Sequence, residues 1–355
     1  MIEPSEMGQA RVRRARRHAV LSSLVLPAIA AATLLAAQTS GPSDHASVRL
    51  HLLDIPSARD LRHFFRYNAD GPPLVTTHRG GARAGFPENA IETFENTLRH
   101  TWSSLEVDPR YTSDGVIVLF HDDTLERTST GTGAVRNHTY EELRRLRLKD
   151  PNGSVTAYRI PTLDTALDWA KGKTVLFLDN KDVDVVERAR RIQTRDARAW
   201  AVVMAYSFDD ARRVHEFDPE IMVQVFLPDA EAVARFDKIG VPWENVIGFV
   251  THTTPGDPGI FRLIGQRGAM AIVGTSRTID RAYGSRTSAK DEMLAGYRAA
   301  IRAGAHVVEA DLGIEAGEAL EPLRAAASAK QRYFRISNVP KFRCLTETGS
   351  CSSIQ

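Results

Sequence analysis

Residues 74–81 read LVTTHRGG, and together with two later segments they decide the predicted fold. The later segments are 105–108 (LEVD) and 116–122 (VIVLFHD). Each of the three is a short apolar run that ends in ionisable residues. Strands of a parallel α/β fold are apolar along their length and present chemical groups at their carboxyl ends. The three segments therefore predict strands that bring charged side chains to one end of a sheet.

From residue 162 onward, strand-like and helix-like segments alternate regularly. Such alternation implies a parallel sheet with right-handed crossovers, and enough units are present to close a (β/α)₈ barrel. We predict a TIM barrel with a small insertion after the strand that ends at His121 and Asp122. Nine segments compete for the eight places, because 109–115 is too short to hold a crossover helix. Either that connection is irregular or one candidate lies outside the barrel, and 246–250 is then the first choice.

The first 37 residues are typical of an export signal. A basic stretch up to Arg17 precedes an uncharged run over 19–37, which ends in the small residues Ala36 and Ala37. About 19 uncharged residues also suffice to cross a bilayer, so an uncleaved anchor that holds the protein near a membrane is the alternative. Both interpretations predict an exported protein, periplasmic or extracellular.

The remaining domain boundaries follow from the same patterns. We predict a linker over 38–55, the barrel over 56–330 with its insertion at about 123–160, and an irregular tail over 331–355. Cys344 and Cys351 both fall in this tail, where they either close a small disulfide loop or stay free.

Charge argues against a nucleic-acid partner. The chain has a net charge of +2, but residues 1–37 carry five arginines and two glutamates. Without this basic segment the net charge is −1. A near-neutral body offers no electrostatic footprint for nucleic acid.

Three acids at predicted strand ends indicate a metal site. Glu106 and Asp108 stand two apart on a strand, so both side chains point to the same face. Adjacent carboxylates repel each other unless a cation lies between them, and a hard ion such as Mg²⁺ or Ca²⁺ prefers oxygen ligands. Asp179 follows another predicted strand and adds a third oxygen donor. The alternative is that these acids only pair with arginines at the rim.

Two histidines and two cations end strands in the same region. His78 and His121 are suited to a reaction in which one proton is removed and another delivered near neutral pH. Arg79 and Lys181 add positive charge that suits a phosphate oxyanion, although both can equally pair with the nearby acids.

In order and spacing, residues 74–210 resemble the glycerophosphodiester phosphodiesterase family. The matching features are His78-Arg79-Gly80, Pro87-Glu88-Asn89, Glu106-x-Asp108, Asp114-Gly115, His121-Asp122, Leu125, Arg127-Thr128, Gly131-Thr132-Gly133, Thr139, Glu141-Glu142-Leu143, Ile160-Pro161-Thr162-Leu163, Asp179-Asn180-Lys181 and Ser207-Phe208.

The resemblance implies a barrel with a small insertion, one divalent metal ion, and hydrolysis of glycerophosphodiesters to glycerol 3-phosphate and an alcohol. By position, it implies that His78 and His121 are the general acid and base. Glu106 and Asp108 then bind the metal, and Arg79 and Lys181 hold phosphate. In the family's usual mechanism a hydroxyl of the substrate's own glycerol attacks phosphorus, with the advantage of a tethered reactant.

This sequence departs from the family pattern in two places. The family usually has Glu where this chain has Asp179, and an Asp-x-Lys also resembles the sphingomyelinase-D-like phospholipases, which act on intact phospholipids or lysophospholipids. The family's closing threonine-aspartate-x-proline is replaced by residues 309–312 (EADL), which leaves the roles of Glu309 and Asp311 open. A related phospholipase and a non-catalytic binding protein therefore remain as alternatives.

Overall fold

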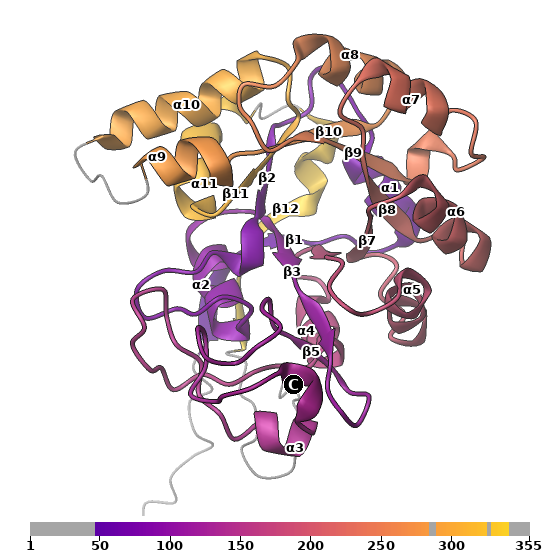
Figure 1. Ribbon diagram of the computed structural model, residues 1–355. Coiled ribbons are helices and arrows are strands. Elements are labelled where there is room, and N and C mark those ends of the chain that lie inside the picture. The colour runs from indigo at the N-terminus through magenta and orange to yellow at the C-terminus, as the bar shows by residue number, and fades with distance from the viewer. Residues whose placement is uncertain (1–46, 284–288, 325–327, 341–355) are drawn as a thin grey trace, which may run out of the picture. The chain divides into compact units, whose positions relative to one another are not determined.

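Eight parallel strands form a closed barrel in the computed structural model, which describes residues 47–283, 289–324 and 328–340. This confirms the predicted TIM barrel (Figure 1). Around the barrel the strands are β2 (Leu74–Thr77), β3 (Ser104–Val107), β6 (Leu176–Leu178), β7 (Ala201–Ala205), β8 (Met222–Phe226), β9 (Val246–Thr251), β10 (Met270–Gly274) and β11 (Val307–Ala310), and β11 pairs with β2 to close the circle.

Helices connect the strands and cover the outside of the barrel (Figure 1). The main ones are α2 (Ile91–His100), α4 (Leu163–Ala170), α5 (Val185–Thr194), α6 (Phe208–Phe217), α7 (Ala230–Phe236), α8 (Pro258–Gln266), α10 (Lys290–Arg302) and α11 (Gly313–Leu320). Shorter helices and turns are η1 (His78–Gly80), η2 (Val135–Asn137), α3 (Tyr140–Leu143), η3 (Trp243–Asn245), η4 (Ser276–Asp280), α9 (Arg281–Tyr283), η6 (Glu321–Leu323) and η7 (Ala329–Tyr333).

Helix α1 (Ala58–Phe65) packs against the interior of the barrel. It begins after Ser57, whose hydroxyl accepts a hydrogen bond from the Asp60 backbone N–H. Its apolar face carries Leu61 and Phe65, which belong to the same buried cluster as inward-facing strand residues. The rings of Phe65 and Phe177 lie 5.7 Å apart, so the helix reaches a residue of β6. This burial removes the apolar end of the barrel from water.

Alternation along each strand separates two buried layers. On β8, Met222 belongs to the cluster inside the barrel, whereas Val223 and Val225 belong to the cluster between strands and helices. Side chains two apart on a strand share a face. Gln224 and Phe226 therefore face the interior with Met222, and only the inward face can supply residues to a site inside the barrel.

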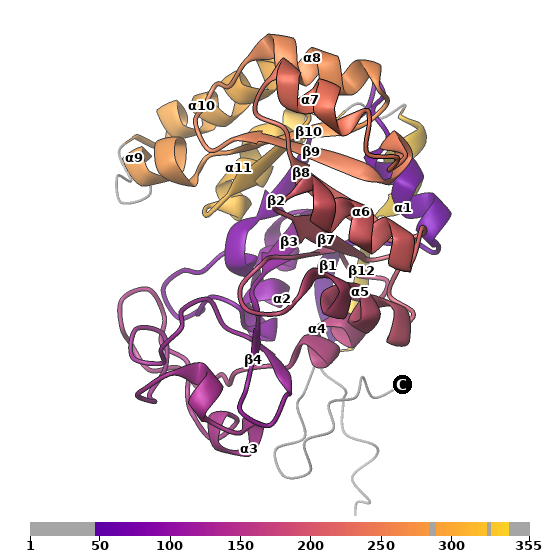
Figure 2. The same ribbon diagram turned by 45° about the vertical axis from the view of Figure 1, so that its right-hand side comes forward.

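The ninth strand candidate lies in an excursion between β3 and α4. Strand β4 (Pro109–Tyr111) pairs antiparallel with β5 (Ile117–Leu119), and neither belongs to the barrel. The prediction that 246–250 is the strand outside was wrong, since β9 occupies a barrel place. The physical reason is the short turn between β4 and β5, which fits a hairpin but not a parallel crossover. Figures 1 and 2 show this excursion, with α3, to one side of the barrel strands.

A two-stranded sheet joins segments from near the two ends of the described chain. Strand β1 (Ser47–Leu53) pairs antiparallel with β12 (Phe334–Pro340) along their whole length. The sequence predicted a linker over 38–55 and an irregular tail over 331–355, so both predictions were wrong for these residues. Each strand is short and partly exposed, and each needs its distant partner for its backbone hydrogen bonds.

The predicted leader, residues 1–37, and both cysteines lie outside the described residues. Within the ranges that the structure does describe, no helix combines the length and apolar character needed to cross a membrane.

Candidate active site

The chain turns sharply where β2 ends, and this turn places His78 and Arg79. Arg79 has φ 50°, and Gly80 and Gly81 also have positive φ. A Cβ atom on Gly80 would collide with the ring of Phe94 on α2, so glycine lets the helix approach the turn. The Arg79 backbone N–H donates to Glu106 Oε2 at 2.8 Å. The turn is therefore tied to the neighbouring strand end.

Three carboxylates gather at the ends of β3 and β6. Glu106, Asp108 and Asp179 each offer an oxygen that lies within 4.8 Å of the others, and all three residues are buried. Lys181 Nζ lies 3.1 Å from Asp108 Oδ1 and 2.5 Å from Asp179 Oδ2. The structure thus brings together the three predicted metal ligands and one of the two predicted phosphate ligands.

The electrostatics of this cluster favour a bound cation. Burial, and then the charge of Asp108, raise the pKa of Glu106 well above its usual value. Burial opposes ionisation of Asp179 as well, but Lys181 lowers the pKa of that carboxyl. Glu106 Oε1 is buried without a hydrogen-bond partner among the described residues. An orphaned carboxylate oxygen within an all-oxygen donor set fits a hard divalent ion.

His78 borders the same cluster and is oriented by Asp311. Its Nδ1 donates to Asp311 Oδ1 at 2.6 Å, and its Nε2 lies 3.9 Å from Glu106 Oε2. Burial alone would lower the pKa of His78, but the hydrogen bond to Asp311 and the charge of Glu106 raise it to about 10. A cation beside Glu106 would offset part of that negative charge. Asp311, whose role the sequence left open, is thus the partner of the histidine.

His121 lies on the other side of Arg79. Arg79 Nη2 donates to its Nε2 at 2.6 Å, and its Nδ1 donates to Asp122 Oδ1 at 2.7 Å. A guanidinium can only donate, so these partners require a neutral imidazole with its proton on Nδ1. Burial, despite the opposing charge of Asp108, lowers the pKa of His121, in agreement with that neutral state.

Arg127 links the histidine to the start of α2. Its guanidinium donates to Asp122 through Nε at 2.5 Å and Nη2 at 2.8 Å, and to Glu88 through Nη1 at 3.0 Å and Nη2 at 2.7 Å. Hydrogen bonds from Arg127 hold the pKa of Asp122 well below its usual range. Glu88 also lies 3.3 Å from Arg79. Asp122 therefore stays ionised and fixes the orientation of the His121 ring.

Asn89 is a site residue to which the sequence gave no role beyond its place in the motif. Its Nδ2 donates to Asp108 Oδ2 at 2.6 Å, and its Oδ1 accepts from the Asp108 backbone N–H at 3.0 Å. Asn89 has φ 59°, a conformation that Asn tolerates better than most residues. The amide thus holds Asp108 from two sides.

We expect Asn89→Ala to destabilise the protein by about 1–3 kcal/mol, because it leaves two buried polar groups of Asp108 without a partner. The backbone conformation would add strain, since Ala disfavours positive φ. Urea unfolding of both proteins measures the change. Asn152→Ala is the matched control, because Asn152 lies in an exposed turn. A loss no larger than that of the control would contradict a structural role for Asn89.

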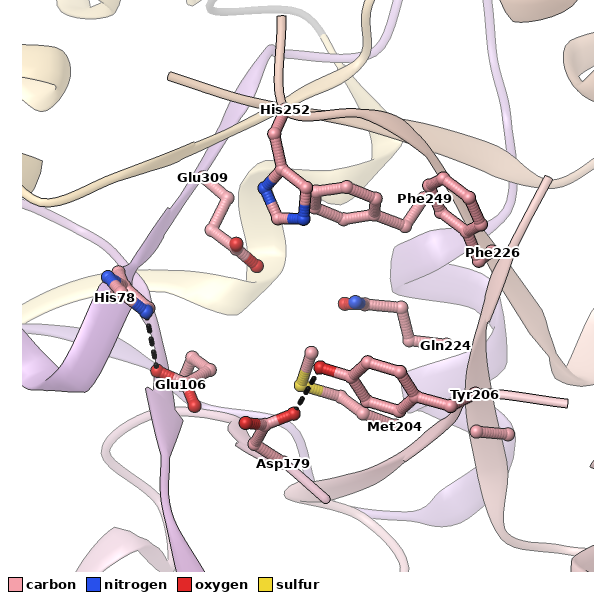
Figure 3. A pocket seen from close by; sticks show the side chains of 11 residues that line it. His78, Glu106, Asp179, Met204, Tyr206, Gln224, Phe226, Phe249, His252 and Glu309 are labelled. Carbon is pink, nitrogen blue, oxygen red and sulfur yellow. Dashed lines mark hydrogen bonds and ion pairs between the residues drawn. The ribbon is translucent and has the colours of Figure 1, made fainter. Parts of the chain in front are cut away.

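A cavity of about 250 Å³ opens beside this cluster (Figure 3). His78, Glu106 and Asp179 line one side of it, whereas Asp108, Arg79, Lys181 and His121 are not among its lining residues. His78 thus borders this cavity whereas His121 does not, and Arg79 occupies the Nε2 of His121.

The rest of the cavity lining consists of residues to which the sequence assigned no firm role. They are Met204, Ala205, Tyr206, Gln224, Phe226, Phe249, His252 and Glu309. Tyr206 donates through its hydroxyl to Asp179 Oδ1 at 2.5 Å. Burial raises the pKa of Glu309 to about 7; the charge of His78 opposes this shift, and the neighbouring acids add to it. In the sequence, the only sign of these cavity residues is a polar side chain within an otherwise apolar strand, as at Gln224.

Comparisons with known proteins agree with this geometry. The model of the "Glycerophosphoryl diester phosphodiesterase family" matches residues 78–232. A glycerophosphodiester phosphodiesterase of Caldanaerobacter subterraneus is 38% identical over 172 residues, which cover 48% of this chain and 67% of that protein. The putative glycerophosphodiester phosphodiesterase YhdW of Bacillus subtilis is 30% identical over 157 residues, which cover 42% of this chain and 64% of that protein. The chain thus spans about two thirds of the length of these relatives.

Solved structures show the same fold. A glycerophosphoryl diester phosphodiesterase from Parabacteroides distasonis matches with a TM-score of 0.77 and 41% identity, over 81% of this chain and 99% of that chain. A phosphodiesterase from Oleispira antarctica matches with a TM-score of 0.52 and 19% identity, over 70% of this chain and 97% of that chain, which is evidence for the fold alone.

Proposed function

Because the chain belongs to the glycerophosphoryl diester phosphodiesterase family, we propose that it hydrolyses glycerophosphodiesters to sn-glycerol 3-phosphate and an alcohol. The observation that carries this proposal is a cluster of three buried carboxylates, two of which, Glu106 and Asp179, line one cavity together with His78. These residues come from three separate strand ends of the barrel, the end at which active sites of this fold lie.

Glu106, Asp108 and Asp179 would hold one divalent cation, Mg²⁺ or Ca²⁺. When bound, the cation supplies Lewis-acid stabilisation of charge on the non-bridging oxygens of the phosphodiester. Asp179 is one methylene shorter than the Glu usual in the family, yet its carboxylate still reaches the other two. Tyr206 and Lys181 each bond one of its oxygens and hold it in that position.

Arg79 and Lys181 would bind the phosphate. Lys181 pairs with Asp108 in the acidic cluster, whereas Arg79 pairs with Glu88 and has its Nε 4.0 Å from Asp108 Oδ2. On binding substrate, Lys181 would exchange its ion pair with Asp108 for a phosphate oxygen and keep its hydrogen bond to Asp179. Arg79 would then exchange His121 for a phosphate oxygen, which frees the Nε2 of that histidine. The same movement would bring the two histidines onto one substrate.

His78 and His121 would share proton transfer. Asp311 fixes the orientation of His78, and Asp122 fixes that of His121, so each imidazole presents Nε2 to the substrate. One histidine takes a proton from the attacking hydroxyl of the substrate or from water, and the other delivers a proton to the departing alcohol. Where the substrate's own hydroxyl attacks, the first product is a cyclic phosphodiester, and a water molecule then opens its ring to give glycerol 3-phosphate. Because both rings are already held in these orientations, bringing them against the substrate costs little further entropy.

The test is phosphorus NMR of the products formed from glycerophosphocholine and from a lysophospholipid, with Mg²⁺ or Ca²⁺ supplied and with chelator as the control. We expect glycerol 3-phosphate from glycerophosphocholine and no turnover with chelator. Release of a cyclic phosphate from the lysophospholipid, with glycerophosphocholine untouched, would favour the sphingomyelinase-D-like alternative. No turnover of either substrate would leave the binding-protein interpretation.

A further inference from the structure

The cavity wall that faces away from the acidic cluster contains polar side chains without protein partners. Gln224 Oε1, Glu309 Oε2 and His252 Nδ1 are all buried and make no hydrogen bond with the described residues. These three residues come from β8, β11 and the end of β9. Figure 3 shows the Gln224 amide pointing into the middle of the cavity, between His78 on one side and Phe226 on the other.

Gln224 is the most informative of the three. It is 4% exposed and occupies an inward position on β8, between Met222 and Phe226. The side chains around it include the apolar Met204 and Phe249. A buried amide oxygen without a hydrogen bond costs stability, and an apolar side chain would fit this place better. A ligand that satisfies the amide explains why a polar residue stands there.

The chemistry of the wall indicates what that ligand carries. Gln224 Oε1 is an acceptor and requires an O–H or N–H donor. Glu309, in its ionised form, makes the same demand. Met204, Phe226 and Phe249 offer apolar contact to a carbon chain. A small group with hydroxyls along a carbon chain meets all of these demands, whereas a quaternary ammonium group has no hydrogen to donate.

The size of the cavity also favours a small group that carries hydroxyls. Its volume of about 250 Å³ lies below the roughly 300–1,000 Å³ of sites for drug-sized ligands. All glycerophosphodiesters share the glycerol half, whereas the alcohol half varies. A small, largely buried cavity of fixed shape suits the shared half.

We infer that Gln224, together with Glu309, binds the terminal hydroxyl of the substrate's glycerol and selects for substrates that carry it. The inference rests on the proposed function. With phosphorus beside His78 and the acidic cluster, the glycerol hydroxyl next to the ester stays near phosphorus. The terminal hydroxyl is the one that reaches across the cavity to Gln224, and the carbon chain between them lies on Met204 and Phe249.

The experiment compares two choline esters with one phosphorus centre: glycerophosphocholine, and its analogue in which propane-1,2-diol replaces glycerol. The analogue keeps the hydroxyl next to the ester and lacks only the terminal one. Wild type and Gln224→Leu are assayed with both substrates by kcat/KM. Gln266→Leu is the matched control, because Gln266 is exposed on α8.

We expect wild type to prefer glycerophosphocholine over the analogue by at least about tenfold, the value of one buried hydrogen bond. Gln224→Leu should lose about the same factor with glycerophosphocholine and stay within about threefold of wild type with the analogue. The variant should melt at the same temperature as wild type or above it, since it removes an unsatisfied buried amide. Gln266→Leu should match wild type with both substrates.

Three results would overturn the inference while the proposed function stands. The first is equal turnover of both substrates by wild type, and the second is a loss of the same factor on both substrates in Gln224→Leu. The third is a loss in the variant that changes when choline is exchanged for another alcohol, which would place the alcohol half at Gln224. If wild type hydrolyses neither substrate with either metal ion, the proposed function itself fails and the inference falls with it.

Discussion

Replacing His78 by alanine is expected to lower kcat for glycerophosphocholine by about 10²–10⁴-fold, the usual contribution of a positioned general acid or base. The imidazole borders the cavity and the acidic cluster, and its Nδ1 is held by Asp311 at 2.6 Å. Its loss removes the group that exchanges a proton with the substrate. His121→Ala should lower kcat by a similar factor. Asp122, which is itself held by Arg127, orients the His121 ring so that its Nε2 can exchange a proton with the substrate.

The measurement is steady-state kinetics with Mg²⁺ or Ca²⁺ supplied, accompanied by thermal melting to show that each variant is folded. His100→Ala is the control, since His100 is exposed at the end of α2 and bonds the Asn96 carbonyl. If turnover stays intact in both His78→Ala and His121→Ala, acid–base catalysis by the two histidines is wrong. Loss in His78→Ala alone would restrict proton transfer to the histidine that lines the cavity.

Glu106→Gln is expected to abolish stabilisation by divalent ions. Wild type should gain about 2.7 kcal/mol at an ion concentration one hundred times the dissociation constant. For a domain of this size that gain raises the melting temperature by several degrees. The variant loses a full charge from a cluster whose three oxygens lie within 4.8 Å of one another. The Gln amide also places a donor where the ion requires an acceptor.

Without a metal ion, the difference in stability between wild type and Glu106→Gln should be reversed, with the variant the more stable. In wild type, burial and then Asp108 raise the pKa of Glu106, so ionising this carboxyl opposes folding. A group whose pKa is raised by folding contributes stability below its unfolded pKa, and this contribution is lost as pH rises through the folded pKa. Metal-free wild type should therefore lose stability relative to Glu106→Gln as pH rises above 4.5, the ordinary pKa of glutamate.

Thermal melting with and without Mg²⁺ or Ca²⁺, over a range of pH, measures both effects. Glu244→Gln serves as the control, because Glu244 is exposed and distant in sequence from the cluster. If neither ion changes the melting temperature of wild type, the result would contradict the metal site and favour a non-catalytic barrel. A variant that still responds like wild type would remove Glu106 from the ligand set.

Much of the site was predictable because it stands at strand ends. Glu106 and Asp108 follow an apolar run with a spacing of two, which fixes them on one face whatever the rest of the chain does. His78 ends another apolar run, and Asp179 a third. Parallel strands bring their carboxyl ends to one edge, so convergence of these groups follows from the alternation of strands and helices.

The cavity wall was harder to predict. Gln224, His252 and Glu309 come from three strands, and nothing local distinguishes a buried Gln with a free amide from one that is hydrogen-bonded. Asn89 and Asp311 were hidden for a related reason. Each acts through a side chain far away in the sequence, Asp108 in one case and His78 in the other. Pairings of this kind depend on how strands are ordered around the barrel.

By itself, the sequence determined the class of fold and the chemistry at the strand ends, because apolar periodicity and residue spacing act within a few residues. Only the tertiary structure decided which strand candidate stays outside the barrel and that β1 pairs with β12. It also decided that Arg79 bonds His121, which does not line the cavity that His78 borders. These features depend on contacts between segments far apart along the chain, and no local preference for helix, strand or turn encodes them.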